Sequence, residues 1–156
     1  MGKVVSQDEI INIVREGQKN GKTFVVTNGC FDILHVGHAR YLKKTKEFAD
    51  YSIVLLNSDK SVKEIKGENR PVNCEDDRAE MLTSLSSVDY VVIFEERSPA
   101  ELLEKIKPDV YTKGADYTLE TLPEREVVVR NNIKVELIEF VQGKSTTNVI
   151  NRINSK

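Results

Sequence analysis

The segment from residue 23 to residue 38 reads TFVVTNGCFDILHVGH, and it decides how the fold is interpreted. Residues 23–27 are a short run of β-branched and aromatic side chains, which is typical of a buried strand. Gly29 then permits a tight turn, and His35, Gly37 and His38 stand where a helix is expected to begin. A strand that turns directly into a helix is the repeating unit of an α/β fold.

The same alternation of strand and helix patterns continues along the chain. Apolar runs rich in Val, Ile and Leu suit strands buried on both faces of a parallel sheet, and they predict strands at residues 23–27, 51–57, 88–94, 109–112 and 133–141. Capping-box sequences and helical spacing predict helices that begin near residues 6 and 98 and that cover residues 76–85, 122–130 and 145–153. The sequence therefore predicts an α/β fold with a doubly wound, parallel five-stranded sheet.

The composition fits one globular domain that spans residues 1–156. Of these residues 39% are hydrophobic and 31% charged, and the length is sufficient for a proper core. Apolar runs are far shorter than the roughly 20 residues that cross a bilayer, and no signal peptide is visible. The formal net charge of −2 disfavours a nucleic-acid surface. We expect a cytoplasmic protein that binds neither membranes nor nucleic acid.

The two cysteines are expected to be free thiols. Cys30 and Cys74 are far apart and lack the CxxC spacing of a metal or redox site. Because the chain also has only two histidines, we predict no protein-held metal.

Both histidines lie in the junction that follows the first strand. His35 and His38 are three residues apart, so on a helix they project from one face. A helix start offers unpaired N–H groups and the positive end of the dipole, both of which favour phosphate, and Gly37 leaves room for a polyphosphate. Two imidazole donors can stabilise a phosphate transition state without a nucleophile. A metal-binding pair or purely structural histidines remain alternatives.

A second phosphate-seeking segment follows the last predicted strand. Ser145 is a natural N-cap, and the hydroxyl groups of Thr146 and Thr147 and the helix start could hold an anion. Plain helix capping is the alternative. Because loops after parallel strands share one edge of the sheet, we expect this segment to meet the histidines.

Basic residues could neutralise the remaining phosphate charge. The polar segment 59–77, which we expect to be a long excursion after the second strand, holds or adjoins most of them. Asp116 could accept hydrogen bonds from a base or ribose, although a turn role is equally ordinary. For any single cation, a solvated surface position is the alternative. The candidates are Lys63, Lys66, Arg70, Arg78 and Lys113, of which Lys66, Arg78 and Lys113 stand out by position.

The pattern GCFDxLHxGH at residues 29–38 resembles the signature of the HxGH cytidylyltransferase-like nucleotidyltransferases. The resemblance covers nearly the whole chain, and its closest form is the adenylyltransferase family that makes ADP-heptose from D-glycero-β-D-manno-heptose 1-phosphate. It implies a Rossmann-like fold and nucleotidyl transfer to a phosphorylated acceptor. The shared motifs are TNGCFDILH at 27–35, NSD at 57–59, KG at 66–67, RPVN at 70–73, KGxDY at 113–117 and STTN at 145–148.

The resemblance also implies roles for individual residues. The partners would be ATP and a phosphorylated small molecule, with Mg²⁺ carried by the triphosphate, and the resemblance allows a homo-oligomer. Catalytic roles fall to His35, His38 and Lys66. Substrate-binding roles fall to Asp32, Arg78 and Lys113. Nucleotide-binding roles fall to Cys30, Phe31, His35, Gly37, His38, Asp116, Ser145, Thr146 and Thr147.

One departure from the family pattern bears on the substrate. Relatives that use CTP commonly have Arg-Thr where this chain has Phe140-Val141. The missing Arg argues against a glycerol-phosphate cytidylyltransferase and leaves Lys144, Lys66 or Arg78 to hold the β- and γ-phosphates. Two alternatives stay open: transfer of AMP or CMP to glycerol 3-phosphate, phosphoethanolamine or FMN, and a nucleotide-binding sensor without turnover.

Overall fold

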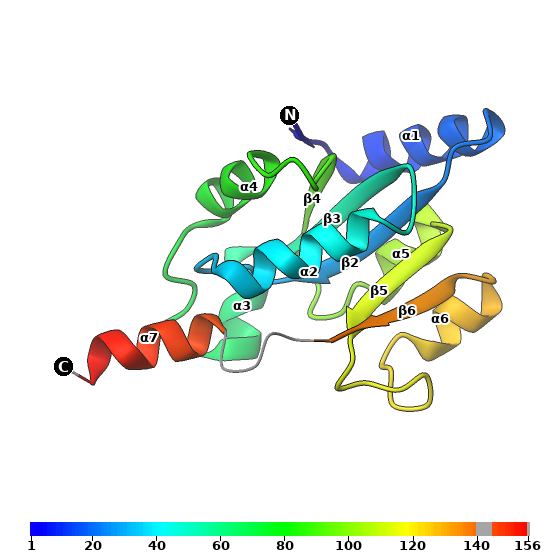
Figure 1. Ribbon diagram of the computed structural model, residues 1–156. Helices are drawn as coiled ribbons and strands as arrows, with labels where there is room; N and C mark the ends of the chain where they lie inside the picture. Colours follow the sequence, from blue (N-terminus) through cyan, green and yellow to red (C-terminus); the bar gives the residue numbers. More distant parts are fainter. Residues whose placement is uncertain (140–144, 156) are drawn as a thin grey trace.

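Six parallel strands form one sheet in the computed structural model, which describes residues 1–139 and 145–155 (Figure 1). The strands are β1 (Lys3–Val4), β2 (Phe24–Gly29), β3 (Tyr51–Asn57), β4 (Tyr90–Phe94), β5 (Val110–Gly114) and β6 (Lys134–Ile138). Their spatial order is β1-β4-β3-β2-β5-β6. The predicted α/β fold with a doubly wound parallel sheet is confirmed, but the predicted number of five strands is wrong.

The additional strand, β1, lies at one edge of the sheet beside β4. The backbone N–H of Lys3 donates to Asp89 O and that of Val5 to Val91 O, both at 2.9 Å. Both residues of β1 are exposed, so no apolar run marks the strand in the sequence. At the other edge, β6 ends at Ile138, earlier than predicted, and Phe140 and Val141 lie outside the described residues.

Seven helices join or follow these strands in the described part of the chain. They are α1 (Gln7–Lys19), α2 (Val36–Lys46), α3 (Asp59–Lys66), α4 (Glu75–Thr83), α5 (Ala100–Ile106), α6 (Arg125–Arg130) and α7 (Thr146–Asn154). The capping box at the start of α1 is confirmed, because Ser6 and Glu9 cap each other's backbone N–H groups. The one predicted at residue 98 is wrong, because α5 has no side-chain cap from its N-cap residue Pro99. The polar segment 59–77 is more regular than expected, since α3 and the start of α4 occupy it.

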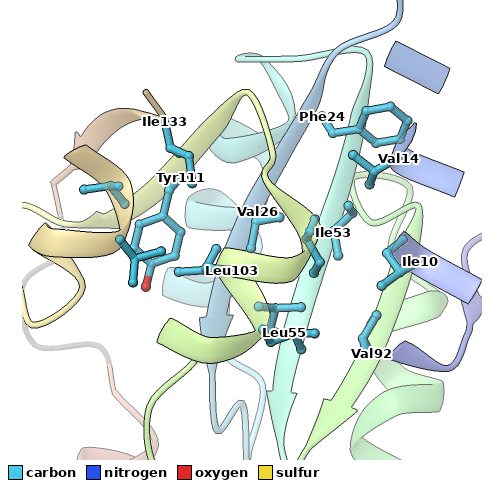
Figure 2. Packing of buried hydrophobic residues seen from close by; sticks show 14 of the residues in the cluster. Ile10, Val14, Phe24, Val26, Ile53, Leu55, Val92, Leu103, Tyr111 and Ile133 are labelled. Carbon is cyan, nitrogen blue, oxygen red and sulfur yellow. The ribbon is translucent and has the colours of Figure 1, made fainter. Parts of the chain in front are cut away.

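Helices cover both faces of the sheet. Along β3, Ile53 and Leu55 face one hydrophobic cluster, while Val54 and Leu56 face the other, as the alternation of a strand requires. The first cluster joins the sheet to α1, α5 and α6, and Figure 2 shows part of it around Ile53. The second cluster joins the sheet to α2 and α4. Burial on both faces explains the continuous apolar runs of the central strands.

The strand order reverses direction next to β2. The chain runs outward from β2 through β3 to β4 and then returns to place β5 on the other side of β2. After β2 the chain enters α2 on one face, and after β5 it leads to α6 on the other face. The connections that follow β2 and β5 therefore leave toward opposite faces, and a crevice at such a switch point is where ligands bind in α/β sheets.

Candidate active site

The turn after β2 brings the chain sharply back over the end of the sheet. A Cβ atom on Gly29 would lie 2.8 Å from Cε2 of Phe31, so any other residue there would displace the buried Phe31 ring. Phe31 itself has a φ of 44°, in the left-handed region, and its side chain is buried. This turn delivers the chain to the start of α2 at the switch point.

His35 and His38 cap the start of α2 reciprocally. Nδ1 of His35 accepts a hydrogen bond from the backbone N–H of Gly37 at 3.1 Å. Nδ1 of His38 accepts from the backbone N–H of His35 at 3.3 Å. The two rings stack with their centroids 3.9 Å apart. The expectation that both project from one helical face is corrected, because His35 is the N-cap residue and precedes the helix.

This capping fixes the tautomer of the two rings. A backbone N–H can only donate, so each Nδ1 is an unprotonated acceptor, and a neutral ring then carries its proton on Nε2. Burial, and secondly the neighbouring His35, lowers the pKa of His38 from 6.5 to about 4. His38 is therefore neutral at pH 7 and can act as a hydrogen-bond donor through Nε2–H.

The start of α7 contacts the loop between β2 and α2, which ends at His35, as the sequence predicted. The hydroxyl of Thr146 donates to the backbone carbonyl of Ile33 at 3.0 Å, and Thr146 is buried. Ser145 caps α7 by accepting from the N–H of Asn148 at 2.9 Å. Two helix N-termini, those of α2 and α7, therefore converge on one region. Lys144, the other candidate in this segment, lies outside the described residues.

These elements enclose a cavity of about 560 Å³ at the carboxyl ends of the strands. Every residue to which the family resemblance gives a catalytic or binding role lines it except Arg78, and the candidate cation Lys63 does not line it either. The members are Cys30, Phe31, Asp32, His35, Gly37, His38, Lys66, Lys113, Asp116, Ser145, Thr146 and Thr147.

Arg78 is the predicted substrate-binding residue that the structure places elsewhere. It is 1% exposed, and its guanidinium donates to the backbone carbonyls of Cys30, Asn57 and Asn73 at 2.7, 2.8 and 2.9 Å. Its remaining terminal nitrogen donates to the carboxylate of Asp59 at 2.8 Å. These donors are all occupied. Arg78 therefore joins the ends of β2 and β3 to the loop between α3 and α4 and does not contact a ligand.

Asp32 lines the cavity, but its carboxylate is occupied by the protein. It accepts from the backbone N–H groups of Val72 and Asn73, both at 2.8 Å, and from Nε of Arg70 at 3.0 Å. Burial alone would raise its pKa, but the hydrogen bonds from Asn73 and Val72 and the Arg70 guanidinium outweigh burial and lower the pKa. Asp32 is thus an anion that holds Arg70 and its loop against the cavity.

Arg70 is a functional candidate that the sequence did not single out. Its side chain is 15% exposed, and it lines the cavity with His35, His38 and Lys66. Only Nε is hydrogen-bonded within the described chain, which leaves two terminal nitrogens for an anion. The available signal was its place directly before Pro71, in a motif shared with the resembling family.

Two further absences are established for the part of the chain that the structure describes. No three His, Cys, Asp or Glu side chains there come together in a way that could hold a metal ion. No described helix has the length and apolarity needed to cross a bilayer.

Comparison with known proteins adds a family match. A family model described as cytidylyltransferase-like matches residues 26–152. The bifunctional protein HldE of Campylobacter fetus is 53% identical over 97% of this chain, and that of Nitratiruptor is 52% identical over 95%. The chain spans only 31% of the length of each of these relatives.

Two solved structures are also similar. The lipopolysaccharide core biosynthesis protein of Thermoplasma volcanium matches with a TM-score of 0.62 and 30% identity, over 78% of this chain and 98% of that one. Pantothenate synthetase of Thermus thermophilus matches with a TM-score of 0.64 over 96% of this chain and 67% of that one, but with 17% identity, so it shares the fold alone.

Proposed function

Because the chain belongs to the cytidylyltransferase-like family, we propose that it transfers AMP from ATP to a sugar 1-phosphate and releases pyrophosphate. The proposed acceptor is D-glycero-β-D-manno-heptose 1-phosphate, which makes ADP-heptose the product. The observation that carries the proposal is the reciprocal capping of His35 and His38 beside the start of α7. This arrangement places two helix N-termini and two neutral imidazoles in the lining of one cavity.

The reaction is an in-line displacement at the α-phosphorus of ATP. An oxygen of the acceptor phosphate forms the new bond to the α-phosphorus, and the bond to the bridging oxygen of the β-phosphate breaks. Pyrophosphate carries away that electron pair. No covalent intermediate with the protein is required, so the protein contributes position and electrostatic stabilisation.

His35 and His38 are assigned to the transferring phosphate. Neutral rings that donate through Nε2–H stabilise the charge that develops on its oxygens. The N–H groups at the starts of α2 and α7 add positive potential in the same region.

Two cations of the cavity, Lys66 and Arg70, are assigned to the pyrophosphate end of ATP. Lys66, at the end of α3, and Arg70, held by Asp32, both line the cavity. Lys144, Lys66 and Arg78 were the predicted alternatives for the β- and γ-phosphates, and Arg70 replaces Arg78 among them because it offers the phosphate-binding fork of a guanidinium. The substrate is taken to be MgATP, since Mg²⁺ usually binds through substrate phosphates and water.

The sugar acceptor rests on the relatives. Two HldE proteins share more than half of their aligned residues with this chain, and the similar structure from Thermoplasma volcanium is named for lipopolysaccharide core biosynthesis. A heptose phosphate acceptor is consistent with both of these similarities. A cytoplasmic location is part of the same proposal, because the free thiols of Cys30 and Cys74 suit a reducing compartment. A homo-oligomer stays a prediction.

The test is pyrophosphate release measured with ATP, CTP and GTP, each against a panel of sugar and polyol phosphates. We expect activity with ATP and the heptose 1-phosphate. Activity with CTP and glycerol 3-phosphate instead would overturn the substrate assignment. ATP binding without pyrophosphate release for any acceptor would favour the sensor.

A further inference from the structure

A buried carboxylate in the wall of the cavity has no role in the proposed transfer reaction. Glu124, the residue before α6, is 3% exposed and lines the cavity. Its Oε2 has no hydrogen-bond partner within residues 1–139 and 145–155. Its Oε1 lies 3.9 Å from Nζ of Lys113, which is too long for a hydrogen bond. Buried carboxylates are normally hydrogen-bonded, so the missing donors point to a ligand.

The groups next to Glu124 are hydrogen-bond donors. Nζ of Lys113 donates to Oδ1 of Asn28 at 3.3 Å, and the hydroxyl of Tyr111 donates to the same oxygen. Burial, and then the charge of Glu124, raises the pKa of Tyr111 well above 10, so its hydroxyl stays protonated. Because an ammonium group cannot accept, Oδ1 of Asn28 must face Lys113, and the amide therefore presents its Nδ2 donors elsewhere.

The chemistry of this wall selects among ligands. An anionic acceptor beside the donor Lys113, in a cavity that Asn28 also lines, matches hydroxyl groups, each of which donates one hydrogen bond and accepts others. A phosphate does not match, because its charge would lie against the negative charge of Glu124, whose only nearby cation within the described residues is Lys113 at 3.9 Å. An apolar group would leave the carboxylate without a donor.

We propose that Glu124 binds neighbouring hydroxyl groups of a sugar, with Lys113 and Asn28 donating to the oxygens of the same hydroxyls. This inference rests on the proposed function, which brings two sugars into the cavity: the ribose of the nucleotide and the acceptor sugar. Both offer the same diol chemistry, and the experiment separates them.

The experiment measures binding by calorimetry, so it needs no turnover. One arm compares a non-hydrolysable ATP analogue with its 2′-deoxy and 3′-deoxy forms. The other arm compares the sugar 1-phosphate with forms that each lack one ring hydroxyl. The proteins are the wild type, Glu124→Ala, the isosteric Glu124→Gln and the control Glu126→Gln, which alters an exposed carboxylate on α6.

In one arm we expect the loss of one hydroxyl to weaken binding to the wild type and to Glu126→Gln by about tenfold to a hundredfold. The same loss should have little effect on binding to Glu124→Ala, because this variant already lacks the carboxylate that accepts from the hydroxyl. Glu124→Gln, which keeps the shape and one acceptor oxygen, should discriminate to an intermediate degree. Discrimination in the nucleotide arm assigns the ribose, and discrimination in the acceptor arm assigns the acceptor sugar.

The inference is overturned if Glu124→Gln, shown by its melting temperature to be folded, distinguishes every deoxy form as well as the wild type does. Glu124 would then be a structural ion-pair partner of Lys113. This outcome differs from failure of the proposed function, in which no acceptor supports pyrophosphate release even by the wild type.

Discussion

The backbone N–H of His35 donates to Nδ1 of His38 at 3.3 Å, so the second histidine of the motif holds the first at the N-terminus of α2. The cap therefore uses the same two side chains that line the cavity. Capping employs the Nδ1 atoms, while the proposed chemistry employs Nε2. This division allows the two roles to be separated by substitution.

Replacing His35 by Asn should remove catalysis and keep the helix cap. Asn is a favoured N-cap residue that can accept from the N–H of Gly37, but it lacks an equivalent of Nε2–H. We expect kcat for pyrophosphate release to fall by about 10² to 10³, with little change in melting temperature. Val36→Ala, at an exposed position beside the motif, is the control and should keep kcat. A His35→Asn enzyme with wild-type kcat would contradict the mechanism.

The stability of the protein should depend on pH through His38. Its pKa is about 4 in the folded chain against 6.5 as its ordinary value. Between these values the unfolded chain binds more protons, so the free energy of unfolding rises with pH. This contribution is complete above pH 6.5 and is lost as the pH falls toward 4, by about 3 kcal/mol at most.

Urea denaturation at pH 7 and pH 4.5 checks this dependence. The wild type should lose more free energy of unfolding between the two pH values than His38→Asn, which has no ionisable group at this position. Equal losses in the two proteins would show that His38 does not titrate in this window.

Replacing Arg70 by Ala should weaken the binding of the triphosphate. Loss of a charge-assisted contact to phosphate predicts a KM for ATP about tenfold higher or more. Asp32→Asn should raise the same KM, because Asp32 acts by holding Arg70. The double variant should therefore be no worse for ATP than the worse single variant. Fully additive effects on the KM for ATP would mean that Asp32 contacts the substrate independently of Arg70. Arg125→Ala, at an exposed position, is the control and should leave this KM unchanged.

Replacing Arg78 by Met should destabilise the fold. Removal of the guanidinium leaves the carbonyls of Cys30, Asn57 and Asn73 without their donor, at a cost of about 3 kcal/mol or more. Arg78→Lys should recover only part of this loss, because an ammonium group cannot reach four acceptors in the guanidinium geometry. Urea denaturation measures the effect, and Arg15→Met, at an exposed position of α1, is the control. If Arg78→Met is as stable as the wild type but has a raised KM for ATP or for the acceptor, Arg78 would be a substrate-binding residue after all.

The central strands could be predicted from sequence because they are buried on both faces. Val54 and Leu56 on one face and Ile53 and Leu55 on the other make β3 a continuous apolar run. The edge strand β1 has no such requirement, since its pairing uses backbone groups that every residue carries. Its two exposed residues gave no signal.

The site could be predicted as far as it depends on chain position. Residues directly after β2 and β5, and those at the start of α7, reach the cavity because the topology places them there. The sequence could not show which of Arg70 and Arg78 lines the cavity. That depends on which side chain is buried against the carboxyl ends of β2 and β3, and the structure shows that it is Arg78. Glu124 was missed because a glutamate is normally exposed, and only the packing of α6 buries this one.

The hydrogen bond from Thr146 to Ile33 joins residues 113 positions apart in the chain. Closing so long a loop in the unfolded chain costs more entropy than pairing neighbouring strands does, so we expect this contact to form after those pairings. A nascent chain that has left the ribosome only as far as β6 contains every strand of the sheet. It still lacks Ser145, Thr146 and Thr147, which line the cavity from the start of α7. We therefore expect the complete anion site to form late in folding.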